Sequence, residues 1–418
     1  MPEPPERPAQ PGGAVTGIAV LVGGVLTQLL STVNGVLAAR MLGVEGRGEI
    51  VLVTALAGMA SQLTIGGGLP NALTKLLADT GFTARDGLGH LVGKLLLISL
   101  APSIAVAGYL LVLERHDGGG TKWGLALGLV LLAMQTMGLR VLIAAMLGEG
   151  TPLVSFVITN LAPQVVTTLA FVLVFAVGGR LDVLETLALI IGSALLTSAF
   201  RLFALRKPTR DPDHRLDGHE LWTLTRRTYV GSVGPIDGLS IDRTLVGSLL
   251  GNTQLGLYSA AFSMASLTAI LGGTVAMVML PRIAVAQGDP EREAFVVRTW
   301  VVGSAVLILA SVVFLELIAG PAIRLAFGED FTGATACARW LIVGGGLLSF
   351  RRVLIAVLQA RGHGVWASWI ELALTPLVVA GVWVSAERHS LVGTGVTMFA
   401  VGLVCCVALG LAARRART

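Results

Sequence analysis

The sequence is too apolar for a water-soluble protein of its size. Its 418 residues are 54% hydrophobic and only 13% charged, and the mean hydropathy is +0.81. Soluble domains carry about 25% charged residues, because their surface must face water. The composition therefore excludes a soluble enzyme or binding domain and predicts an integral membrane protein.

The net charge of +5 does not indicate nucleic-acid binding, because no basic stripe with interleaved aromatic residues accompanies it. The three cysteines, Cys337, Cys405 and Cys406, lie in or beside apolar stretches. Their spacing fits neither a metal site nor a disulfide framework, so we interpret them as small apolar packing residues. We expect no metal and no cofactor.

The apolar stretches predict an all-α membrane protein with about twelve transmembrane helices. Each stretch has about 20 residues, the length that crosses a bilayer. The first run, 14–39, is too long for the core of a cleaved signal peptide. The stretches lie at 14–39, 49–69, 91–113, 123–147, 153–177, 183–205, 227–250, 256–280, 297–319, 335–358, 364–385 and 389–412.

A polar connector, residues 206–226, divides these stretches into two sets of six. Its Pro and Asp residues disfavour a helix at first, whereas the part from His219 to Arg227 is expected to form a short amphipathic segment on the lipid headgroups. His214 and His219 have no diagnostic ligand spacing, so a solvated linker is favoured over a metal site. The predicted organisation is a disordered tail (1–13), a six-helix bundle (14–205), the linker (206–226), a second six-helix bundle (227–412) and a basic tail (413–418).

The distribution of Lys and Arg predicts that both termini are cytoplasmic. With that orientation, the cytoplasmic segments hold about twice as many basic residues as the outer loops. We therefore expect a multi-pass protein of the cell inner (plasma) membrane.

Two short sequence matches indicate that the halves are related. Arg140-Val-Leu-Ile-Ala recurs as Arg352-Val-Leu-Ile-Ala, and Leu42-Gly43 with Gly48 recurs as Leu250-Gly251 with Gly256. Six is an even number of spans, so both halves insert with the same orientation. This predicts parallel repeats around a central cavity, a plan known among secondary transporters.

The seventh stretch carries the strongest cluster of intramembrane polar residues. It includes Asp237, Asp242 and Arg243, next to Pro235 and Gly238, which weaken the helix. Charged groups at this depth are costly and usually face the interior. Asp242 and Arg243 are either part of a proton or anion site in the cavity or members of interhelical structural ion pairs.

Other ionisable residues lie within or at the ends of the stretches. A cationic interior would suit a substrate that carries phosphates, which Arg binds with two hydrogen bonds. The alternative for each cation is a position in the cytoplasm or among the headgroups. The cations are Arg40, Lys75, Arg140, Arg351 and Arg352, and Glu371 is a further candidate for ion coupling.

Several segments resemble the polysaccharide flippases of the multidrug, oligosaccharidyl-lipid and polysaccharide exporter superfamily. Two of them are Leu37-Ala-Ala-Arg40-Met-Leu-Gly43-Val-Glu-Gly-Arg-Gly48 and Gly68-Leu-Pro-Asn-Ala-Leu-Thr-Lys75. The strongest is Ile241-Asp242-Arg243-Thr-Leu-Val-Gly-Ser-Leu-Leu-Gly251, followed by Gly256-Leu-Tyr258 and Pro281-Arg282. In order and spacing, the match covers most of the chain.

The resemblance implies a V-shaped cavity between two six-helix bundles. It implies a polyprenyl-diphosphate-linked saccharide as cargo, flipped from the cytoplasmic to the outer leaflet, and enzymes of polysaccharide assembly as partners. Mapped by position, Arg40, Arg140, Arg243 and Arg352 are candidates for diphosphate binding. Asp242, with Asp237 and Glu371, is a candidate for coupling to H⁺ or Na⁺.

Three other functions remain open. A drug/cation antiporter of the same superfamily would need acidic residues deep in the first half, where the stretches contain almost none. A membrane enzyme of polysaccharide assembly would need an acid/base or metal cluster, and the only dense ionisable outer loop is Glu114-Arg-His116-Asp117. A purely structural membrane scaffold is the third alternative.

Overall fold

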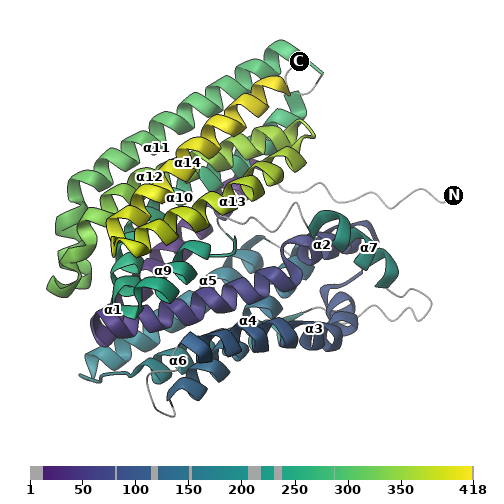
Figure 1. Cartoon of the computed structure of the whole chain (residues 1–418). Helices are drawn as coiled ribbons and strands as arrows, with labels where there is room; N and C mark the ends of the chain where they lie inside the picture. Colours follow the sequence, from purple (N-terminus) through teal and green to yellow (C-terminus); the bar gives the residue numbers. More distant parts are fainter. Residues whose placement is uncertain are drawn as a thin grey trace.

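The computed structural model describes residues 13–80, 82–113, 121–149, 153–205, 218–229, 238–286 and 288–416. Within these residues every regular element is a helix, and most of the helices run side by side (Figure 1). Several sequence expectations fall outside this part of the chain. They concern residues 1–12 of the tail, 206–217 of the linker, the ionisable loop at 114–117, and Asp237.

The helices follow one another in chain order. They are α1 (Gly13–Ile65), α2 (Gly68–Thr80), α3 (Ala84–Leu113), α4 (Thr121–Gly148), α5 (Leu153–Ala176), α6 (Val183–Ala204), α7 (Gly218–Tyr229), α9 (Ile241–Leu250), α10 (Asn252–Ala286), α11 (Pro290–Phe327), the 3₁₀ helix η2 (Glu329–Ala334), α12 (Thr335–Ala360), α13 (Gly364–Glu387) and α14 (Leu391–Arg415). The expected amphipathic segment of the linker is confirmed as α7.

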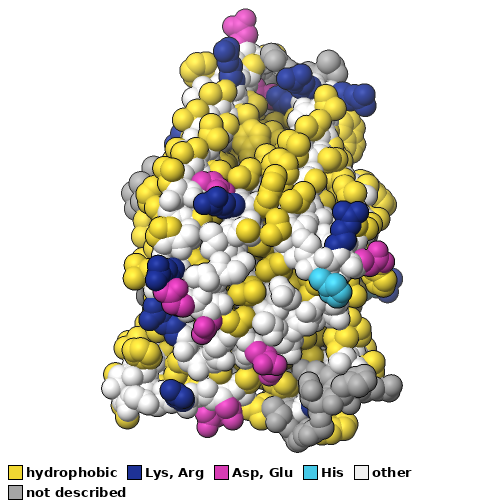
Figure 2. Space-filling model, turned by 60° about the vertical axis from the view of Figure 1, so that its left-hand side comes forward, with side chains coloured by type: hydrophobic (Ala, Val, Ile, Leu, Met, Phe, Trp, Pro, Cys, Tyr) yellow, Lys and Arg dark blue, Asp and Glu magenta, His cyan; other side chains and the backbone are white. Residues whose placement is uncertain are grey.

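The protein is a multi-pass α-helical membrane protein. Nine helices of the described chain are long and apolar enough to cross a membrane. Large apolar side chains such as Phe203 (87% exposed) and Leu317 (77% exposed) lie on the outside, as expected where the solvent is lipid. Figure 2 shows hydrophobic side chains over much of one face, with several Lys and Arg side chains at its upper end and others scattered lower down.

The expected count of twelve spans differs from nine for identifiable reasons. Helix α1 runs through two of the expected stretches, 14–39 and 49–69, with a kink between them. In α3 the apolar part with described side chains is Leu97–Leu113, which is shorter than a full span. The stretch at 227–250 is not one continuous helix, because the backbone leaves the helical conformation at Ser240, directly before α9 begins at Ile241.

Glycines turn the backbone at corresponding places in α1 and between α9 and α10. Gly43 has φ 71° and ψ −171°, and Gly251 has φ 86° and ψ 173°, a conformation that residues with a Cβ rarely adopt. These are two of the positions that match in the sequence. Each turn lets the chain continue as a second helical segment at a new angle.

Beyond these turns, α1 and α10 touch through their backbones. A Cβ on Gly48 would come within 1.8 Å of the Asn252 carbonyl oxygen, and one on Gly256 within 1.9 Å of the Val44 carbonyl oxygen. The contact is reciprocal, since each glycine packs against the turn that precedes the other glycine. Glycine is required at both positions, and the two segments are sealed together there.

Helix α12 lies at the centre of the second half, with α10, α11 and α14 against it. Its three consecutive glycines each face a different neighbour. Cβ atoms would come within 3.1 Å of Phe399 at Gly344, 2.9 Å of the Ala265 carbonyl oxygen at Gly345, and 2.5 Å of Val312 at Gly346. Small residues allow this close packing where no hydrophobic effect drives helices together in lipid.

We predict that Gly48→Ala destabilises the protein by about 1–3 kcal/mol, the usual cost of forcing extra atoms into a packed contact. A lower thermal unfolding temperature in detergent would report the loss. Gly58→Ala on the same helix is the matched control, because no atom lies within 4 Å of a Cβ there. Equal unfolding temperatures for the two variants would contradict the sealed contact.

Candidate functional site

A cavity of about 1890 Å³ opens between the two halves of the chain. Helices α1, α5 and α6 line one side, and α9, α10, α11, α12 and α14 line the other. Most of the lining is apolar, with amide and hydroxyl side chains along α1, α5 and α10. One end lies next to the sealed contact of Gly48 and Gly256, and the other reaches the end of α10 near Ala286.

The charges in this cavity are almost all positive. Among the lining residues that the structure describes, there are five arginines and a single carboxylate, Asp242. The arginines are Arg47, Arg243, Arg282, Arg292 and Arg352. In a cavity with largely apolar walls this excess attracts anions and repels cations.

Asp242 and Arg243 lie in the first turn of α9, which starts directly after Ser240 in the left-handed region (φ 49°). Asp242 is 4% exposed and accepts a hydrogen bond of 2.8 Å from the Tyr258 hydroxyl on α10. Arg243 donates to the Ser240 hydroxyl at 2.9 Å, and its guanidinium carbon lies 4.6 Å from the centre of the Phe262 ring. The break before α9 thus places both side chains at the wall of the cavity.

Two cavity arginines retain unused donors. The Nε atoms of Arg47 and Arg243 are buried and have no hydrogen-bond partner within the described residues. Arg47 crosses α1 at Gly35, where a Cβ would come within 2.9 Å of its Nη2, and its charge repels that of Arg243. A buried donor without an acceptor is costly, so this end of the cavity suits an anion.

The other three arginines lie further along the second half. Arg352 crosses α10 at Gly273 and donates to the Ala269 carbonyl oxygen at 3.3 Å. Arg282 is exposed, with its guanidinium carbon 4.9 Å from the centre of the Trp300 ring. Arg292 is exposed in the first turn of α11, where Asp289 caps the helix. Arg282 and Arg292 therefore place two exposed positive charges at the open end of the cavity.

Arg40 and Arg140, also candidates from the sequence, do not line the cavity. Arg40 donates to the carbonyl oxygens of Ala326 (2.7 Å) and Leu325, at the last turn of α11. This contact links the two halves on the sealed side. Arg140 on α4 donates to the Gln62 side chain on α1 and lies inside the first half.

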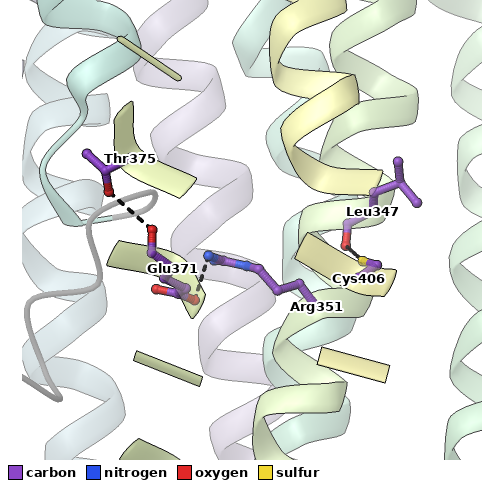
Figure 3. Close-up of polar contacts among 5 residues, drawn as sticks. All are labelled: Leu347, Arg351, Glu371, Thr375 and Cys406. Atoms are coloured by element: carbon purple, nitrogen blue, oxygen red, sulfur yellow. Dashed lines mark hydrogen bonds and ion pairs between the residues drawn. The ribbon is translucent and has the colours of Figure 1, made fainter. Parts of the chain in front are cut away.

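Glu371 also lies apart from the cavity lining. Its carboxylate is 2.7 Å from Nη1 of Arg351, and the two side chains are 8% and 2% exposed. Figure 3 shows this pair between α12 and α13, with the Thr375 hydroxyl donating to the Glu371 carbonyl oxygen and the Cys406 thiol of α14 donating to the Leu347 carbonyl oxygen. The pair joins the helices of the second half.

Three further arginines, Arg47, Arg282 and Arg292, line the cavity although the sequence did not mark them as candidates. For Arg47 no sequence signal marks the inward direction, because the turn at Gly43 sets it. The proximity of Arg282 to Trp300 joins residues of different helices and has no local pattern.

Comparison with known proteins agrees with the fold and with the family resemblance. Residues 238–336, which include α9 and α10, match a family described as polysaccharide biosynthesis protein. No curated protein matches the chain in sequence. The whole chain, in contrast, is similar in fold to several solved transporters.

Three of these structures illustrate the similarity. An inward-facing multidrug resistance MATE family transporter of the MOP superfamily is 15% identical with a TM-score of 0.66, and the match covers 96% of this chain and 98% of that one. The lipid II flippase MurJ in an inward closed conformation is 13% identical with a TM-score of 0.70, covering 96% and 88%. A MOP superfamily transporter from Pyrococcus furiosus is 14% identical with a TM-score of 0.59, covering 96% of each.

The chain therefore has the fold of the MOP superfamily transporters. More particularly, residues 238–336 match the polysaccharide biosynthesis family on that fold, in agreement with the resemblance noted in the sequence.

We predict that Glu371→Ala destabilises the protein by about 3–5 kcal/mol, because it leaves the buried charge of Arg351 without its carboxylate. Thermal unfolding in detergent measures the loss. Glu387→Ala, which removes an exposed carboxylate from the same helix, is the control. Replacing both partners, as Arg351→Met with Glu371→Leu, should recover most of the stability; a double variant as unstable as Glu371→Ala would refute the paired-charge explanation.

Proposed function

We propose that the protein flips a polyprenyl-diphosphate-linked oligosaccharide from the cytoplasmic to the outer leaflet, by alternating access, for cell-envelope polysaccharide biosynthesis. The observation that carries this proposal is the cavity, with five arginines against one carboxylate. The polysaccharide biosynthesis family segment and the fold shared with a lipid II flippase support it.

The arginines suit a diphosphate in both charge and geometry. A guanidinium group presents paired N–H donors that match two phosphate oxygens, and charge-assisted bonds of this kind are about twice as strong as neutral ones. The unused Nε donors of Arg47 and Arg243 lie at the sealed end of the cavity, where the oxygens of a diphosphate would accept hydrogen bonds from them. Arg243 and Arg352 remain candidates from the sequence, and Arg47 is added to them.

The size and polarity of the cavity suit the rest of the cargo. Ligand pockets usually measure about 300–1000 Å³, so this one has room for an oligosaccharide. Gln28, Asn34, Gln164 and Ser263 offer amide and hydroxyl groups to sugar hydroxyls. Exposed apolar side chains on α10, such as Met277 and Val285, would face the polyprenyl chain at the membrane.

Alternating access would come from rocking of two related halves. We propose two parallel-repeat bundles of six helices each, 14–205 and 227–412, with both termini in the cytoplasm. The reciprocal contact of Gly48 and Gly256 supports such a relation, as do the matching turns at Gly43 and Gly251. In this orientation the sealed side is the outer one, and the structure is an inward-facing state.

Ion coupling is assigned to Asp242. Binding of H⁺ or Na⁺ would cancel the only negative charge of the described lining and strengthen the field acting on the diphosphate, while release of the ion would weaken it. Asp237 lies outside the described residues. Glu371 is engaged by Arg351 away from the cavity, so we rank it behind Asp242.

A drug/cation antiporter is the second candidate, because multidrug transporters share the fold. The charges weigh against it. A lipophilic cation would meet five arginines, and the one carboxylate already accepts a hydrogen bond from Tyr258. The transport assay below separates the two functions.

We predict that Arg243→Gln and Arg47→Gln each slow flipping about 10- to 100-fold, since each removes a charged donor worth about 1.5–3 kcal/mol. The assay uses liposomes that contain a labelled polyprenyl-diphosphate saccharide and a membrane-impermeant probe of its leaflet. Arg388→Gln is the control, because Arg388 is exposed and outside the cavity. If the protein exports organic cations and flips no saccharide, the flippase proposal is wrong and the protein is a cation antiporter.

A second prediction concerns coupling. Asp242→Asn keeps a hydrogen-bond acceptor for Tyr258 and removes the charge. We expect an imposed pH or Na⁺ gradient to change the flipping rate of the wild type and to leave that of Asp242→Asn unchanged. A variant that responds to the gradients like the wild type would rule out Asp242 as the coupling site.

A further inference from the structure

A second pocket lies between α3 and α7, away from the central cavity. It has a volume of about 420 Å³ and is lined by Lys94, Gly218, His219, Trp222, Thr223 and Arg226. Among the described residues that line it, two are permanent cations, one is an imidazole, and none is a carboxylate. The pocket combines positive charge from two helices with a hydroxyl group and an indole ring.

Helix α7 is fixed in place by the face opposite the pocket. Leu221 is 2% exposed and packs with apolar residues of α2 such as Leu73. The Tyr229 hydroxyl donates to the Leu63 carbonyl oxygen, and a Cβ on Gly68 would come within 2.8 Å of the Thr225 carbonyl oxygen. The basic side chains on the pocket face are therefore held on an anchored helix.

The position of the pocket relative to the membrane points to a lipid rather than a free ion. In the sequence, Lys94 comes directly before the uncharged stretch of α3 that runs to Leu113, and Leu97 in this stretch is 74% exposed. Lys94 thus lies at the depth where basic side chains meet lipid headgroups. Trp222 is half-buried in the same pocket, and Trp is enriched at this level of the bilayer.

We propose that this pocket binds the phosphate headgroup of an anionic membrane phospholipid. Arg226 would hold two phosphate oxygens, Lys94 would supply a second positive charge from α3, and the Thr223 hydroxyl would donate a further hydrogen bond. The lipid chains would run along the exposed apolar side chains of α3. Because α7 comes between the two halves in the chain, the bound lipid would brace this connection against the first half.

The test uses the full-length protein in nanodiscs of phosphatidylcholine, with and without phosphatidylglycerol. We expect phosphatidylglycerol to raise the unfolding temperature of the wild type. Lys94→Gln with Arg226→Gln should weaken its binding about 30-fold, because each cation close to an anionic lipid contributes about fivefold. Arg227→Gln is the matched control, since Arg227 is exposed on the same helix and outside the pocket.

Three outcomes would overturn the proposal. The first is an equal response of the double variant and the wild type to phosphatidylglycerol. The second is the same stabilisation by inorganic phosphate in pure phosphatidylcholine, which would make free phosphate the ligand. The third outcome concerns Thr223→Glu, which adds a carboxylate to the pocket and should therefore repel the phosphate. Native mass spectrometry measures the lipid that this variant retains, independently of whether the double variant folds. Retention of phosphatidylglycerol at the wild-type level would contradict the proposal.

Discussion

The backbone contact between α1 and α10 at Gly48 and Gly256 determines the shape of the site. Where two helices meet without side chains between them, they lie closest together, and the walls of the cavity diverge away from that point. The turns at Gly43 and Gly251 supply the angle, and Arg40 adds a hydrogen-bonded link to the end of α11 on the same side. A cavity closed at one end and open at the other follows from these few residues.

Within this shape, the chain divides its charges between two environments. Arg351 is buried against Glu371 among the helices of the second half, while its neighbour Arg352 lines the cavity. Adjacent residues of a helix point about 100° apart, so the same turn of α12 directs Arg351 toward α13 and Arg352 toward the cavity. The charges that are paired hold the bundle together, whereas the charges left in the cavity give it its preference for anions.

The sequence predicts the membrane class, the helical fold and the position of the α9 charges at the cavity well, because these depend on composition, on span length and on a local motif. Gly48 and Gly256 match as a repeat in the sequence, but a repeat alone does not indicate that the two glycines meet. Arg243, Asp242 and Arg352 line the cavity. Arg40 and Arg140 do not, since the direction of a side chain from a lipid-embedded helix depends on which neighbours surround it. Nearly all faces of these helices are apolar, so hydrophobic periodicity does not identify the inner one.

The Arg351–Glu371 pair also has a mechanical consequence. A rotation of α12 about its own axis would draw Arg351 away from Glu371 and place an uncompensated charge among apolar side chains. Such a rotation is therefore strongly resisted, and the direction of Arg352 relative to the second half stays fixed. The pair thus favours movement of α12 together with α13 over rotation of α12 alone.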